Sequence, residues 1–179
     1  MGVIKPPLPV KLIVSMISGH VELFQAAGET LTQHFGAIDY TSSILPFTHT
    51  TYYDEEFGSG LQRQIIAFHP LIDPGRLAEI KVFTNDLEQT WSEGGQRRIN
   101  LDPGYVSQAK LVLATTKNHA HRIYIGQGIY AEVTLMYRDK DWQALPWTYP
   151  DYRSAPYLEI LRTIRGIYMA QLKVLHAAG

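Results

Sequence analysis

A β-hairpin in the C-terminal half of the chain is predicted to place charged and aromatic side chains on one face. Two strictly alternating segments, 121–125 and 129–138, flank the turn sequence Gly126-Gln127-Gly128. Counting outward from this turn predicts cross-strand pairs of Ile125 with Ile129, Tyr124 with Tyr130, and Arg122 with Glu132. Because side chains alternate between the faces of a strand, the tyrosine pair and the ion pair should share one face.

The predicted pair of Arg122 and Glu132 has two interpretations. The more common one is a cross-strand ion pair on a solvated face, which contributes less than about 1 kcal/mol to stability. In the functional one, Arg122 presents its fork of N–H donors to an anion, and Glu132 orients that fork or acts as a general base.

A turn-like segment is the second candidate. The sequence Asp102-Pro103-Gly104-Tyr105 follows a short predicted strand at 97–101 and consists of residue types that favour turns. Because loops at strand ends often carry binding and catalytic groups, Asp102 is a candidate catalytic residue and Lys110 a candidate ligand contact. Turn chemistry alone also explains the segment.

The third candidate is a polar stripe on a predicted helix. Lys81, Thr84, Asn85 and Glu88 lie three and four residues apart, so they share one side of the helix. Such a stripe is usually a solvated face. Lys81 and Asn85 are ligand contacts only if this side of the helix faces the hairpin.

Aromatic residues in predicted loops form the last group: Tyr52, Tyr53, Trp147, Tyr149 and Tyr152. They either pack as lids or stack on a planar ring while Arg153, Arg122 or Lys117 holds a phosphate. The predicted catalytic candidates are therefore Glu132 and Asp102. The predicted ligand contacts are Arg122, Tyr124, Tyr130, Lys110, Lys117, Tyr149, Arg153, Lys81 and Asn85.

No metal site is predicted, and the cofactor stays unassigned. His119 and His121 lie close to Glu132 in sequence, but strand alternation puts His121 on the opposite face from Glu132. His49-Thr50-Thr51 matches half of the paired motif of two-histidine phosphoesterases, and the second half is missing. The sequence also lacks the motifs of P-loop proteins, serine hydrolases, zincins and Rossmann enzymes.

Hydrophobic periodicity predicts the elements that position these residues. Strands are expected at 10–17, 61–68 and 97–101, extended chain at 38–47 and 142–153, and an exposed loop at 48–60. Helices are expected after Ser18-Gly19, Pro74 and Pro156, with apolar stripes from Val21 to Phe35, Leu77 to Trp91 and Tyr157 to Leu175. Segment 107–116 fits either a helix or a strand.

This order of elements predicts a single α+β domain over residues 1–179. The expected fold is a ferredoxin-like split βαβ antiparallel sheet with helices on one face, extended by a C-terminal β-hairpin and a final helix.

Composition limits the possible functions. Hydrophobic residues make up 45% of the chain and charged residues 18%, which excludes general disorder. With 16 basic and 17 acidic residues the net charge is -1, so no global positive field attracts DNA or an anionic membrane. The absence of cysteine excludes disulfides and thiolate metal sites. The apolar run at 12–17 is too short to span a bilayer, and it predicts a strand of a cytoplasmic protein.

Three segments carry a resemblance to a known family. They are Asn100 to Tyr105, KLVLATTKNHAHRIYIGQGIYAEVTLMY at 110–137, and PWTYPDYR at 146–153, together with residues 79–85. These segments are similar to the bacterial domain-of-unknown-function family 4416. The resemblance implies no particular chemistry. Some members are labelled GTP-binding proteins, which the missing P-loop does not support here.

The sequence therefore leaves two functions open. The first is a site that binds or acts on a small anionic metabolite or nucleotide. The second is a non-catalytic module that binds RNA or protein, although the neutral charge and the missing RNP-like motif disfavour RNA. A concave pocket lined by Arg122, Glu132 and Asp102 would favour the first function, and a flat open sheet would favour the second.

Overall fold

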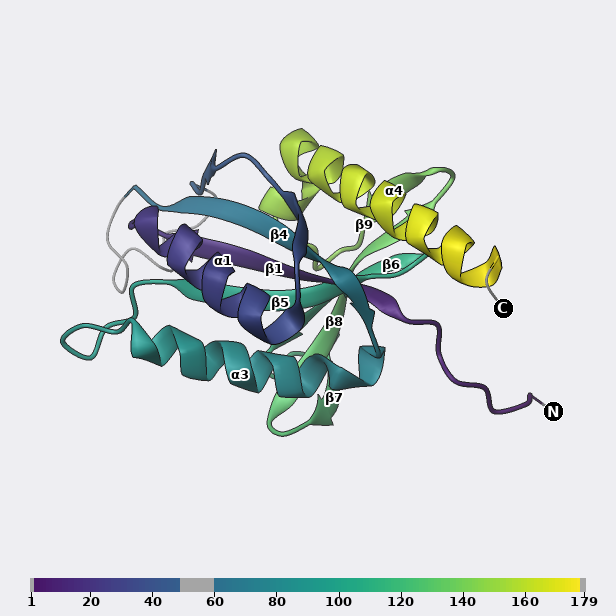
Figure 1. The fold of residues 1–179 in the computed structure, drawn as a ribbon, viewed down its shortest axis with the longest axis horizontal. Coiled ribbons are helices and arrows are strands. Elements are labelled where there is room, and N and C mark those ends of the chain that lie inside the picture. Colours follow the sequence, from purple (N-terminus) through teal and green to yellow (C-terminus); the bar gives the residue numbers. More distant parts are fainter. Residues whose placement is uncertain (1, 49–59, 178–179) are drawn as a thin grey trace.

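The computed structural model describes residues 2–48 and 60–177, in which nine antiparallel strands form one open sheet with three α-helices (Figure 1). The predicted His49-Thr50-Thr51 motif, Tyr52 and Tyr53 lie outside the described residues. The elements are β1 (Val10–Ser18), α1 (Glu22–Phe35), β2 (Ile38–Thr41), β3 (Leu45–Pro46), β4 (Gln62–Ile72), α3 (Leu77–Thr90), β5 (Asn100–Val106), β6 (Lys110–Thr115), β7 (Ile123–Gly126), β8 (Ile129–Arg138), β9 (Asp141–Ala144) and α4 (Ala155–Ala177). Short 3₁₀ turns precede α3 at Pro74–Arg76 and α4 at Asp151–Arg153.

Strand β1 lies in the interior of the sheet. The strand order is β2-β4-β1-β5-β6-β8-β7, and β3 and β9 pair with β4 and β8. Every residue of β1 is buried, and Leu12 and Ile13 belong to hydrophobic clusters on opposite faces of the sheet. Burial on both faces explains why this strand is a continuous apolar run in the sequence.

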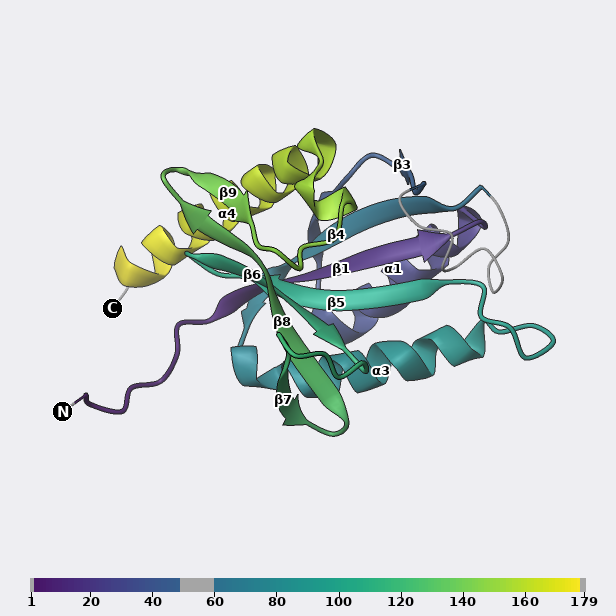
Figure 2. The same cartoon turned by 180° about the vertical axis from the view of Figure 1, so that it is seen from behind.

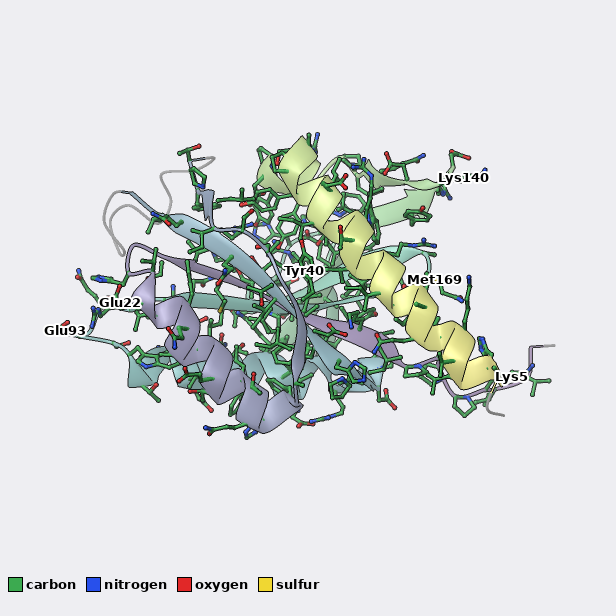
Figure 3. All side chains as sticks on the ribbon, turned by 45° about the horizontal axis from the view of Figure 1, so that its top comes forward. Lys5, Glu22, Tyr40, Glu93, Lys140 and Met169 are labelled. Carbon is green, nitrogen blue, oxygen red and sulfur yellow. The ribbon has the colours of Figure 1, made fainter. Side chains whose placement is uncertain are left out.

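Two helical layers cover the two faces of the sheet. Helices α1 and α3 lie side by side on the face of Leu12, as Figure 1 shows. Helix α4 packs on the face of Ile13, where Tyr40 and Met169, both labelled in Figure 3, belong to the same cluster. The hydrophobic cluster under α4 also includes residues of β8, so this face of the sheet reaches the predicted hairpin.

The three predicted helices are present, with differences at their ends. The stripe of α3 buries Leu77, Ile80 and Leu87 as predicted. Val21 is 42% exposed because it precedes the first helical turn, and Leu175 is 51% exposed in the last turn of α4. None of the described helices has the length and apolar character needed to cross a membrane.

The prediction of a turn at Asp102-Pro103-Gly104-Tyr105 is wrong. These residues lie inside β5, which pairs with β1 from Asn100 to Val106. Gly104 is required for close packing, because a Cβ there would overlap the carbonyl oxygen of Val112 on β6. The ambiguous segment 107–116 contains strand β6 and no helix.

The predicted hairpin is present with a changed register at its turn. Tyr124 pairs with Tyr130 as predicted, but a bulge makes Gly126 rather than Ile125 the partner of Ile129. Arg122 lies just before β7 and still reaches Glu132 on β8.

Candidate functional site

A pocket with a volume of about 840 Å³ opens where β5 and β6 separate. The two strands pair only between Gly104–Val106 and Leu111–Leu113. Beyond this point β5 continues along β1, whereas β6 and β8 turn away from it (Figure 2). Pro103, which has no N–H, is the first residue past the pairing, so its missing donor costs no hydrogen bond to β6. Side chains of α3 and of residues 149–152 also line the gap.

Ion pairs dominate the described part of the pocket lining. It contains five Lys or Arg and four Asp or Glu side chains. Each carboxylate is paired with one of the cations: Glu88 with Arg97, Asp102 with Lys81, Glu132 with Arg122 and Asp151 with Arg63. Pairing of this kind is what allows charged groups to be buried.

The polar stripe of α3 forms one wall of the pocket, so its interpretation as a solvated helix face is wrong. Lys81 is 5% exposed, and its Nζ donates to the carbonyl oxygen of Leu101 at 2.9 Å and to Oδ1 of Asp102 at 3.2 Å. Asn100 Nδ2 donates to the other oxygen of Asp102 at 2.7 Å. The helix and strand β5 therefore hold the Asp102 carboxylate from two sides.

Glu88 extends this wall and is 1% exposed. Its Oε1 accepts a hydrogen bond from the backbone N–H of Leu101 at 2.7 Å, and its Oε2 accepts one from Arg97 Nη1 at 2.7 Å. Burial raises the pKa of Glu88 above its ordinary value, and the charge of Lys81 and these two hydrogen bonds oppose the rise.

The pair of Arg122 and Glu132 forms the hairpin side of the pocket. Arg122 Nε donates to Glu132 Oε2 at 2.9 Å, and the side chains are only 4% and 3% exposed, so the interpretation as a solvated pair is wrong. His121 Nε2 also contacts Glu132 Oε2 at 2.9 Å. The prediction that His121 faces away from Glu132 is wrong because His121 lies in the turn before β7, where strand alternation does not apply.

The guanidinium of Arg122 is fixed by two further hydrogen bonds. Its Nη1 donates to the carbonyl oxygen of Lys117 at 3.0 Å and its Nη2 to the hydroxyl of Tyr149 at 3.1 Å. A guanidinium carries five N–H donors, so these three bonds leave N–H groups that have no acceptor in the described part of the chain. Arg122 is therefore both oriented and able to bind a further acceptor.

The loop that carries Tyr149 is anchored to the hairpin. Trp147 Nε1 donates to the carbonyl oxygen of Val133 on β8 at 2.8 Å. Arg153, a predicted ligand contact, instead donates to carbonyl oxygens of its own loop at 2.7 to 2.9 Å, those of Leu145, Pro146 and Thr148. These contacts hold Tyr149 at the pocket.

Arg63 and Asp151 form a part of the pocket that the sequence did not indicate. Arg63 is 5% exposed, and its Nη1 donates to Asp151 Oδ2 at 2.5 Å. Its guanidinium carbon lies 4.4 Å from the ring centroid of Phe47 and 5.4 Å from that of Tyr152. The Nε of Arg63 makes no hydrogen bond to any described residue.

Seven of the eleven predicted site residues line this pocket: Glu132, Asp102, Arg122, Lys117, Tyr149, Lys81 and Asn85. Tyr124 and Tyr130 instead form an edge-to-face pair with ring centroids 5.4 Å apart. Lys110 is exposed at the start of β6, and Arg153 holds the loop.

Metal ligands do not gather in the described part of the chain. His119 and His121 have ring centroids 5.9 Å apart, but no group of three or more His, Asp or Glu side chains there could hold a metal ion. Four other charged or amide residues of the lining were not predicted: Arg63, Gln89, Arg97 and Asp151.

Comparison with known proteins identifies a family. No curated protein and no solved structure matches the chain. A family model described as "Domain of unknown function (DUF4416)" matches residues 8–168, which include all the ion pairs of the pocket. The match covers most of the 179 residues, and the chain therefore belongs to the DUF4416 family.

Proposed function

We propose that this protein binds a small organic anion in the pocket between α3, β5, β6 and the hairpin. The observation that supports this proposal is an excess of hydrogen-bond donors. Both oxygens of all four lining carboxylates already accept hydrogen bonds. Among the described residues, Arg122 finds acceptors for three of its five N–H groups and Lys81 for two of its three, and Arg63 Nε finds none.

A phosphate or carboxylate of a ligand would complement this excess of donors. Hydrogen bonds between ionised partners are short and strong, and the arginine fork suits both anions. The volume of about 840 Å³ is also typical of pockets that bind metabolites. In this proposal Glu132 positions Arg122, and Asp102 positions Lys81, because their oxygens are already occupied.

Isothermal titration calorimetry with phosphorylated and carboxylated metabolites tests the proposal. Arg122→Lys should weaken binding about tenfold or more, because an ammonium group cannot replace the fork. Arg162→Lys is the matched control, since Arg162 forms an ion pair with Asp141 outside the pocket. Binding that is equal in the wild type and both variants, or absent from all three, would contradict the proposal.

The second candidate function is a non-catalytic protein-binding module. Ile123, Tyr124 and Ile125 are 72%, 60% and 36% exposed on β7, which ends the main path of the sheet. An exposed apolar edge strand favours pairing with a strand of another protein. Strand β7 contains no Lys or Arg, which disfavours RNA as the partner of this surface. Ile123→Lys would abolish such a complex, measured by size-exclusion chromatography, and leave anion binding unchanged.

We also propose that the part of the chain from β1 to β5 is a ferredoxin-like unit. The antiparallel order β5-β1-β4-β2, with α1 and α3 on one face, supports this assignment. We propose a bacterial source from the membership of the chain in the DUF4416 family. A cytoplasmic location is proposed because the apolar run 12–17 is buried as strand β1. A net charge of -1 supports the absence of DNA and membrane partners.

A further inference from the structure

Two side-chain amides of α3 line the pocket without a hydrogen-bond partner among the described residues. Asn85 and Gln89 lie one helical turn apart, next to Lys81 and Glu88 on the same wall. Lys81 and Glu88 form hydrogen bonds with β5 and Arg97, whereas neither amide makes a side-chain hydrogen bond within the described chain. Each amide therefore offers a donor group and an acceptor to the pocket.

An aromatic ring is available at the same pocket. Tyr149 is 50% exposed, while its hydroxyl is held by Arg122 Nη2 at 3.1 Å. Its loop is anchored through Trp147 and Arg153. A ring that is fixed at its hydroxyl and half exposed is a surface on which a planar group can stack.

Building on the proposed anion site, we infer that the ligand is a nucleotide. Side-chain amides pair well with the mixed donor and acceptor edge of a base, which Asn85 and Gln89 would read. Tyr149 would stack on the base, and Arg122 would bind the phosphate. A dicarboxylate would satisfy Arg122 but would leave the amide pair and the ring without a partner. A sugar phosphate has no planar group that could stack on Tyr149.

Calorimetric titration with three classes of probe tests this inference. The probes are the four ribonucleoside 5′-monophosphates, the corresponding nucleosides, and ribose 5-phosphate. The proteins are the wild type, the double variant Asn85→Ala/Gln89→Ala, Arg122→Lys and the control Gln33→Ala. Gln33 is an exposed helical glutamine of α1 that does not line the pocket, so it matches Gln89 in helix propensity and solvation.

At least one nucleoside monophosphate should bind about tenfold or more tightly than ribose 5-phosphate. The double variant should lose this advantage and keep the affinity for ribose 5-phosphate, and Gln33→Ala should behave as the wild type. Arg122→Lys should weaken binding of both phosphates.

Equal binding of ribose 5-phosphate and all four monophosphates would overturn the inference and leave the anion site intact. Binding of the nucleosides with the affinity of their monophosphates would overturn the role of Arg122, and with it the anion site. A nucleotide preference that survives in the double variant would overturn the assignment to the amide pair.

Discussion

Burial of the ion pair between Arg122 and Glu132 determines what its removal should cost. The side chains are 4% and 3% exposed, so neither charge is screened by bulk water. Arg122→Met keeps most of the side-chain volume and removes the guanidinium. Of the residues that the structure describes, only His121 and Thr134 would then remain as partners of Glu132. We expect a loss of about 3–5 kcal/mol, the usual cost of leaving one buried charge without its partner.

Urea denaturation of Arg122→Met, Glu132→Gln and the double variant measures this cost. The double variant should be less destabilised than the sum of the single variants, because the second change removes the charge that the first left unpaired. The same cycle on Arg162 and Asp141, whose side chains are 39% and 48% exposed, should show a coupling below about 1 kcal/mol. A loss below about 1 kcal/mol for Arg122→Met, with additive effects, would refute the reasoning.

Three further predictions concern Leu87, Glu88 and the binding of GTP. Leu87→Ala should destabilise the protein by about 2–5 kcal/mol, because Leu87 is 8% exposed in the core under α3. An unchanged denaturation midpoint would exclude this packing. Because burial raises the folded-state pKa of Glu88, protonation of this carboxyl stabilises the folded protein relative to the unfolded chain. This stabilisation is complete below the ordinary glutamate pKa of about 4.3 and is lost as pH rises through the raised value. Glu88→Gln should remove this component from thermal denaturation curves recorded against pH, and equal slopes in both proteins would argue against it. Titration with GTP and magnesium should show no submicromolar binding, because no P-loop is present in the sequence, and tight magnesium-dependent binding would reveal an unrecognised phosphate loop.

Local signals were sufficient to predict α3 and the hairpin. Leu77, Ile80 and Leu87 repeat at helical spacing after Asp73, whose side chain accepts a hydrogen bond from the N–H of Gly75 at 2.7 Å. The alternation on both sides of the glycine turn likewise predicted that Tyr124 pairs with Tyr130. These elements depend on residues that are close in the sequence.

The pocket could not be predicted because it depends on contacts between distant strands. Asp102-Pro103-Gly104 has the composition of a turn, but pairing with β1 extends it, and the proline falls where β6 has left β5. Lys81 is buried because α3 lines the gap between β5 and β6. The sequence of the helix alone contains no pattern that predicts this burial. Arg63 lies between Gln62 and Gln64 in the sequence of β4, so its neighbours do not mark it as buried. Its buried partner, Asp151, lies 88 residues away in the sequence.

Native mass spectrometry of the freshly purified protein, followed by identification of the released compound, tests the proposed anion site most directly. The wild type and Arg162→Lys should both retain a compound that carries a phosphate or a carboxylate. Occupancy should fall in Arg122→Lys, because the fork of N–H donors is lost while the positive charge remains. A retained compound without an acidic group, or equal retention of an anion by Arg122→Lys, would contradict the assignment.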